Sequence, residues 1–186
     1  MKKLCFLWVL LLLLAGCSPN NTEIERAMAL RSRILQAQQS PFDVSITADY
    51  GYKLHQFSVF CRGDSQGNLT FTVNEPESIA GITGKISDTG GKLTFDDTAL
   101  QFDTMADDTI SPVSAPWIFL KTLRSGKLTS AGMEGESLRL SIDDSYEDDA
   151  LHLDIWLDEE DFPQRAEILY AGKRILSLDV KNFQIQ

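Results

Sequence analysis

Apolar and polar residues alternate along several short stretches of the chain, which is the pattern of half-buried β-strands. Residues 42–50 read Phe-Asp-Val-Ser-Ile-Thr-Ala-Asp-Tyr, with an apolar residue at every second position. Gly51, Gly63-Asp64 and Gly90-Gly91 are among the turn residues that separate such stretches. Because connections this short favour antiparallel neighbours, the pattern predicts an antiparallel meander. Further strands are predicted at 54–62, 68–74, 81–87, 92–95, 99–102, 127–133, 137–142, 150–157, 165–170 and 174–183.

A helical spacing of apolar residues precedes the first strand. Thr22 is a candidate N-cap, Glu25 occupies the capping-box position, and Pro41 should stop the helix, so we expect it to run to about Gln39. The residues expected on its apolar side are Ile24, Ala27, Met28, Ile34 and Leu35.

A second helix is predicted inside the meander, between Ser111 and Gly126. Ser114 is a candidate N-cap, Pro116 suits the first turn, and Gly126 ends the helix. A helix that is apolar nearly all round is buried on most sides or binds a ligand. The candidate ligand-binding residues are Trp117, Ile118, Phe119, Leu120 and Leu123.

The size of the predicted sheet determines the fold class. About ten strands at roughly 4.8 Å spacing give a sheet on the order of 45 Å wide. Two helices, each about 10 Å in diameter, cover about half of its apolar face, so the sheet must curl. We therefore expect a mainly β (α+β) fold: a strongly curved antiparallel sheet forming an unclosed barrel, with both helices on its concave face. Such a sheet leaves an apolar groove or cavity.

The N-terminus has the organisation of an export signal. Lys2 and Lys3 precede an apolar run that is too short to span a bilayer, and the run ends in Leu14-Ala15-Gly16-Cys17. This ending resembles the bacterial lipoprotein signal, in which the cysteine carries acyl chains such as palmitate; the alternative is an ordinary secretory signal with a chance cysteine. We expect residues 1–16 to be a signal peptide, 17–22 a lipidated tether and 23–186 a single domain. The protein would then be anchored through Cys17 on the extracytoplasmic face of a bacterial membrane.

Charge and cysteine content restrict the partners. The net charge of −10 argues against nucleic acid and against peripheral binding to anionic lipid, both of which need clustered basic residues. Cys5 leaves with the signal and Cys17 is expected to be lipidated, so Cys61 has no partner for an intrachain disulfide. Its strand position predicts a core residue and a monomer. An intermolecular disulfide, giving a weak homodimer, is the alternative.

Other candidate chemistry is sparse. The strand pattern places His152 with Asp154 and Trp156 on the polar face, where a paired or solvated histidine is expected more than a metal ligand. The acidic run 143–149 lacks the ligand spacing of a calcium loop and predicts a solvated hairpin tip. No nucleophile elbow or phosphate-binding loop occurs in the sequence. We therefore expect no enzymatic activity, no metal and no cofactor.

The C-terminal residues bring a family resemblance. Ile155-Trp156-Leu157-Asp158, then 162–168 (Phe-Pro-Gln-Arg-Ala-Glu-Ile), Gly172 and Asn182-Phe183 resemble the last hairpin of the bacterial lipoprotein-carrier and outer-membrane lipoprotein-sorting superfamily, which includes lipoproteins of spore-forming bacteria. The resemblance implies an unclosed antiparallel barrel with helices inside the curve, and the handling of lipid or lipoprotein. No position here matches the lipid-gating arginine of the soluble carrier.

Two functions of different class follow. In the first, the concave face binds an acyl chain, a lipoprotein or another hydrophobic ligand. In the second, the interior is packed, and the protein is a tethered docking or activator protein for an envelope or cell-wall enzyme or sensor. An open apolar volume of several hundred Å³ inside the curve favours the first function, and a packed interior favours the second.

Overall fold

The computed structural model describes residues 21–49, 54–96, 98–103, 105–106, 109–147 and 150–186. The predicted signal peptide and Cys17 lie outside these ranges. Residues 21 and 22, predicted as the end of the tether, belong to the first helix instead.

Eleven strands form one antiparallel sheet in the order β6-β5-β4-β3-β2-β1-β13-β12-β11-β10-β9. A separate pair, β7 (Met105–Ala106) and β8 (Thr109–Ile110), follows β6. The strands of the sheet have these bounds: β1 Gln39–Asp49, β2 Leu54–Asp64, β3 Leu69–Glu75, β4 Thr83–Ser87, β5 Gly90–Phe95, β6 Thr98–Phe102, β9 Lys127–Glu134, β10 Ser137–Asp143, β11 His152–Leu157, β12 Pro163–Tyr170 and β13 Lys173–Lys181.

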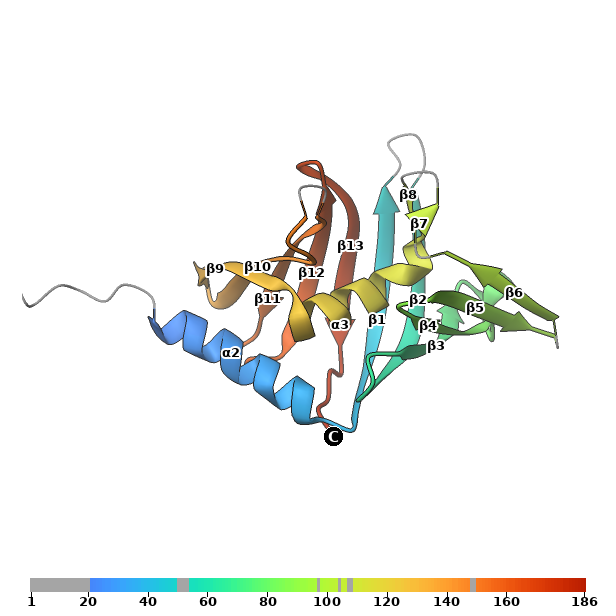
Figure 1. The fold of residues 1–186 in the computed structure, drawn as a ribbon. Coiled ribbons are helices and arrows are strands. Elements are labelled where there is room, and N and C mark those ends of the chain that lie inside the picture. Colours follow the sequence, from blue (N-terminus) through green and yellow to red (C-terminus); the bar gives the residue numbers. More distant parts are fainter. Residues whose placement is uncertain (1–20, 50–53, 97, 104, 107–108, 148–149) are drawn as a thin grey trace, which may run out of the picture.

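The sheet consists of two meanders joined at its centre. Strands β1 to β6 pair in sequence order, strands β9 to β13 do the same, and β1 pairs with β13 with Ile46 opposite Leu178. The edges of the sheet are β6 and β9, so among the described residues it does not close (Figure 1). The predicted fold class, an open antiparallel sheet with two helices, is confirmed.

The first helix, α2 (Asn21–Gln36), contacts β9 and the internal helix (Figure 1). Only part of its predicted apolar face is correct: Ala27 and Ile34 are buried, together with Leu30. The other predicted residues, Ile24, Met28 and Leu35, are 43–51% exposed. The helix docks along one narrow stripe, so the apolar residues beside this stripe remain in water.

The predicted end of α2 is also corrected. The helix ends at Gln36, and Pro41 lies inside β1. Pro41 has no backbone N–H to donate, but its carbonyl accepts the N–H of Gln184 at 3.0 Å. The C-terminal residue Gln186 in turn exchanges backbone hydrogen bonds with Gln39. The C-terminal tail therefore extends the pairing beside the start of β1.

The internal helix, α3 (Ala115–Ser125), follows two short 3-10 turns in the chain, η1 (Glu77–Ile79) and η2 (Pro112–Ser114). Gly126 ends the helix as predicted, and its N–H donates to the carbonyl of Thr122 at 2.8 Å. The predicted side-chain cap is wrong: Ser114 Oγ makes no capping bond and is buried without a partner among the described residues. Because η2 already turns the chain helically, Ser114 lacks the extended backbone that a side-chain cap requires.

An aromatic cluster fixes α3 to the centre of the sheet. Phe119 of α3 meets the ring of Phe42 at 5.8 Å and that of Phe183 at 6.4 Å, both edge-on. Phe42 and Phe183 stack on each other at 5.4 Å. These rings lie over the junction of β1 and β13, so α3 is held where the two meanders join.

Candidate functional site

The five predicted ligand-binding residues of α3 lie in the packed core. Their exposed fractions are at most 6%. Trp117 borders the turn between β2 and β3, where its indole N–H donates to the carbonyl of Gly67 at 3.0 Å. Leu120 packs so closely against Gly63 that a Cβ on this glycine would lie 2.1 Å from Leu120 Cδ2. The inside of the curve is thus filled along α3, and direct ligand contact by these five residues stays a prediction.

An open apolar groove lies beyond the start of α3. Its volume is about 280 Å³, and it is bordered by strands β2, β3 and β5 and by both 3-10 turns. We call it the apolar groove. Its lining residues are His55, Phe57, Val73, Ile79, Ile82, Leu93, Pro112 and Val113.

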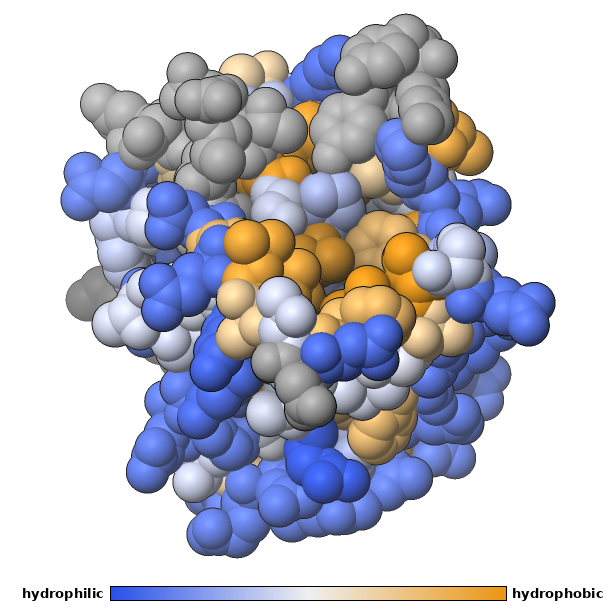
Figure 2. Space-filling model, turned by 90° about the vertical axis from the view of Figure 1, so that its right-hand side faces the viewer, coloured by the Kyte–Doolittle hydropathy of each residue, from blue (hydrophilic) through white to orange (hydrophobic). Residues whose placement is uncertain are grey.

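The groove is open because the sheet extends farther than its helices. Strands β4 to β6 continue past the N-terminal end of α3 (Figure 1). On the inner face of this extension, Leu93 is directly opposite Leu100, which is 63% exposed, and Phe95 is 49% exposed. Figure 2 shows apolar side chains gathered around a hollow on this side of the molecule, with hydrophilic residues around them. The part of the sheet that the two helices leave uncovered is therefore the end formed by β4 to β6.

Sequence reasoning missed the groove residues although their signal was present. Phe57 and Leu93 occupy inward positions of predicted strands, but alternation alone does not show which part of a sheet a helix leaves uncovered. Ile79 lies in the irregular connection between β3 and β4, and so does Ile82, because β4 begins at Thr83 rather than at residue 81 as predicted.

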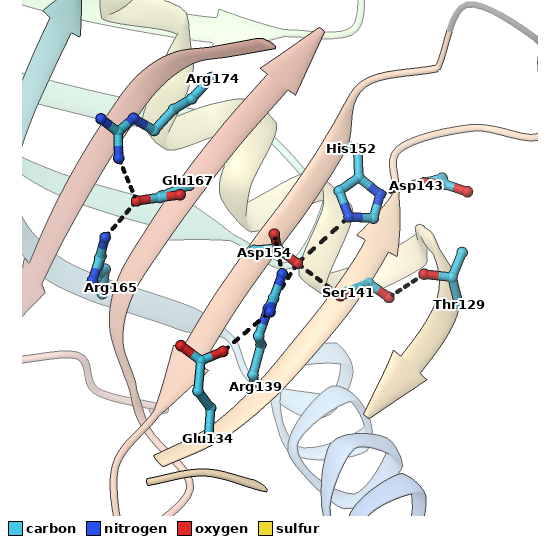
Figure 3. Close-up of polar contacts among 10 residues, drawn as sticks. All are labelled: Thr129, Glu134, Arg139, Ser141, Asp143, His152, Asp154, Arg165, Glu167 and Arg174. Carbon is cyan, nitrogen blue, oxygen red and sulfur yellow. Dashed lines mark hydrogen bonds and ion pairs between the residues drawn. The ribbon is translucent and has the colours of Figure 1, made fainter. Parts of the chain in front are cut away.

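A network of polar residues covers the opposite, outer face of β9 to β11 (Figure 3). Asp154 is only 5% exposed, and its carboxylate accepts Arg139 Nη2 at 2.7 Å and Ser141 Oγ at 2.7 Å. Burial raises the pKa of Asp154, but the hydrogen bonds and charge of Arg139, the hydroxyl of Ser141 and the charge of His152 together bring it below the usual value. The network keeps Asp154 charged and links the outer faces of β10 and β11.

Strand β12 continues this polar surface. Glu167 lies between Arg165 and Arg174 and pairs with both (Figure 3). The ring of Trp156 lies between two guanidinium groups, with Arg165 at 4.7 Å and Arg139 at 5.5 Å from its centre. Since the charged groups of this surface bind one another, we interpret it as structural.

His152 and Cys61 have the surroundings that the strand pattern predicts for them. His152 is a paired strand histidine, with Nδ1 at 2.8 Å from Asp143 and Nε2 at 3.5 Å from Asp154. Within the described ranges, no group of three histidine, cysteine or acidic residues could hold a metal ion. Cys61 is fully buried on β2, which confirms its assignment to the core. Burial, assisted by the charge of Asp43, raises the pKa of its thiol well above the usual value.

Across the part of the chain that the structure describes, neither helix has the length and apolar character needed to cross a membrane.

Comparisons with known proteins gave structural similarities only. No family model matches the sequence, and no curated protein matches it. A protein of the LolA superfamily from Nitrosomonas europaea is 9% identical at a TM-score of 0.45, over 86% of this chain and 93% of its own. A domain assigned to outer membrane lipoprotein sorting, from Vibrio parahaemolyticus, is 9% identical at a TM-score of 0.47, with coverage of 89% and 92%. A structure of the CwlD amidase from Clostridioides difficile with the GerS lipoprotein contains a chain that is 10% identical at a TM-score of 0.44, with coverage of 91% and 99%.

The solved structures similar to this chain thus include proteins of the superfamily that its last hairpin resembles. At identities near 10% and TM-scores below 0.5, the similarity carries no information on a ligand or a partner.

Proposed function

We propose that this protein is a membrane-anchored, extracytoplasmic binding protein without enzymatic activity, and that its apolar groove takes an acyl chain of a lipid or lipoprotein. In this proposal Cys17 carries the anchor. The packed residues of α3 lie outside the lining of the groove, and the groove residues contact the acyl chain.

The uncovered inner face beyond α3 carries the proposal. A volume of about 280 Å³ lies just below the range of roughly 300–1,000 Å³ for ligand pockets. It therefore suits one acyl chain end rather than a whole lipid with several chains. The exposed side chains of Phe95 and Leu100 continue the apolar surface from the groove towards the edge strand β6, which gives the rest of the chain a surface to follow.

The packing of α3 favours a second candidate, a tethered docking or activator protein. In this candidate the apolar groove accepts a side chain of an envelope enzyme or sensor instead of a lipid, and the residues that line the groove contact that side chain. A photoreactive fatty acid distinguishes the two candidates, because only the first binds it in the groove.

The test uses the full chain in phosphatidylcholine nanodiscs with a diazirine-labelled palmitate. After irradiation, peptide mass spectrometry locates the cross-links. The proposal expects cross-links on segments 55–57, 79–82, 93 and 112–113, and their loss when excess unlabelled palmitate competes.

A matched pair of variants makes the test specific. Ile79 lies in the groove at 38% exposure, and Ile24 lies on α2 at 43% exposure. Ile79→Ser should reduce groove cross-linking several-fold, whereas Ile24→Ser should leave it unchanged. Palmitate cross-links spread over the surface without competition, or equal effects of the two variants, would move the function to the docking candidate.

A further inference from the structure

The outer face of β2 to β6 carries a row of polar residues that runs across the strands. Its members are direct partners in the register of neighbouring strands, and all of them are exposed. We call it the cationic row. In strand order its residues are Arg62, Thr70, Lys85, Lys92 and Gln101.

A second row of registered partners lies beside the cationic row on the same face. We call it the hydroxyl row. It begins at Phe60, whose ring lies 5.7 Å below the guanidinium of Arg62, and it ends at Ala99. The residues between them are Thr72, Thr83 and Thr94.

The three cations of the row have no ion-pair partner within 4 Å among the described residues, although the protein has an excess of acids. Asp64 is the carboxylate that interacts with the row, through the charge of Lys85. Its oxygens already accept the backbone N–H groups of Gln66 and Asn68 and the side-chain amide of Asn68. Asp64 is therefore held in its own turn and does not neutralise the row.

Lys85 and Lys92 are directly opposite each other on neighbouring antiparallel strands. Like charges in this position destabilise a sheet. A bound anion between the two ammonium groups would remove the repulsion. The arrangement thus lowers stability in the free protein and becomes favourable only with an anionic partner.

Two adjoining hollows follow the rows and share Lys85 and Lys92. One, of about 390 Å³, contains both rows from Phe60 to Thr94 and no acidic residue. The other, of about 520 Å³, continues to Gln101 and reaches Asp103 at its far end. Five strands at roughly 4.8 Å spacing make the strip about 19 Å long, which suits an extended polymer.

We infer that this strip binds an acidic polysaccharide. The cations pair with carboxylates of the polymer, the threonine hydroxyls and Gln101 exchange hydrogen bonds with sugar hydroxyls, and Phe60 offers an apolar surface to a sugar ring. The strip lies on the face of the sheet opposite the apolar groove, so the inference does not depend on the proposed ligand.

The position of the strip disfavours the membrane of the anchor as its partner. Asn21 is four positions after Cys17, so an anchored chain keeps the start of α2 within about 14 Å of the lipid surface. Strands β4 to β6 lie at the opposite end of the molecule from the start of α2 (Figure 1). The strip therefore faces material farther from the membrane, where polymers of the envelope are present.

The test measures binding of fluorescent polygalacturonate to the full chain in phosphatidylcholine nanodiscs, by anisotropy at low and high salt. Neutral dextran and labelled phosphatidylglycerol nanodiscs are the comparison probes. Exposed charge pairs contribute modestly, so the double variant Lys85→Gln/Lys92→Gln should weaken polygalacturonate binding about tenfold. The matched double variant Lys173→Gln/Lys181→Gln changes the net charge equally at exposed positions of β13 and should change the affinity less than twofold.

The inference is supported if polygalacturonate binds in a salt-sensitive way, dextran binds weakly, and only the Lys85/Lys92 variant loses affinity for polygalacturonate. Equal losses in both double variants would overturn the inference, as would a preference for phosphatidylglycerol nanodiscs or no binding of the polymer. Both variants change exposed side chains, so both should fold: the Lys173/Lys181 variant should unfold at the temperature of the parent, and the Lys85/Lys92 variant at the same or a slightly higher temperature, because the repulsion is gone. A failed test leaves palmitate cross-linking in the groove unaffected, so the two proposals are separable.

Discussion

Replacing Phe119 by alanine tests whether the interior along α3 is a packed core or a ligand site. Phe119 is fully buried and contacts Phe42 and Phe183 in the aromatic cluster. A phenylalanine buries on the order of 200 Å² of surface, which at about 25 cal/mol per Å² corresponds to about 5 kcal/mol. The Cβ of alanine retains part of this burial free energy, whereas the cavity that the ring leaves behind adds a cost. The expected loss of unfolding free energy is therefore about 3–5 kcal/mol.

This loss is large compared with the total free energy of unfolding. A domain of this size unfolds with roughly 5–15 kcal/mol, so the Phe119→Ala variant should retain a fold but melt about 10 °C lower. Phe95→Ala is the matched control, because Phe95 is 49% exposed on the uncovered part of the same sheet. It should cost at most about 2 kcal/mol, since half of its surface already contacts water and no closed cavity forms.

Urea unfolding, followed by tryptophan fluorescence, gives both free energies. In a packed core the Phe119 variant loses several times more stability than the Phe95 variant. If Phe119→Ala costs less than about 1 kcal/mol and also abolishes binding of the palmitate probe, the interior is a ligand site and the packing argument is wrong.

Three further predictions concern other parts of the chain. Cys17→Ala should release the protein from membranes, and mass spectrometry of the parent should find acylation at this residue; an unmodified Cys17 in membrane-extracted protein would contradict the anchor. Cys61 should react with thiol reagents only after unfolding, because burial raises its pKa and hinders access; fast labelling of native protein or a disulfide-linked dimer on a non-reducing gel would count against this. Asp154→Asn should cost about 2 kcal/mol at pH 7. Since the folded pKa of Asp154 lies below its unfolded value of about 4, this cost should be constant above about pH 5 and decline as the pH falls below about 4 and through the folded pKa, as measured by urea unfolding at each pH; a cost that does not change with pH would refute the ion-pair role.

The strands were the part of the fold that the sequence predicted best. Alternation marks a half-buried strand directly, so each predicted strand corresponds to a strand of the sheet, with ends that differ by a few residues; residue 50 lies outside the described residues. Strands β7 and β8 have two residues each, too few for any period to show. The exposed side of α2 was missed because helical spacing shows which residues share a face, whereas the width of the contact depends on the neighbouring elements.

The candidate site was predicted only in outline. The apolar character of α3 indicated either a core or a ligand helix, and its burial by Phe42 and Phe183 depends on contacts between distant parts of the chain. Likewise, alternation placed His152 and Asp154 on the polar face, but their partners Asp143 and Arg139 depend on the register of β10 and β11. The cationic row needs the register of five strands before it becomes visible.

The pairing of β1 with β13 has a consequence for the order in which the chain folds. A polypeptide that leaves a ribosome or an export channel N-terminus first presents β1 to β6 early, and these strands can pair with one another as they emerge. The central position beside β1 is filled only by the last strand, with Gln186 beside Gln39 as its final contact. The edge of β1 that pairs with β13 must therefore keep its backbone N–H and C=O groups unpaired, and open to other chains, until β13 has emerged. A truncation that removes β13 would therefore remove the joint between the two meanders.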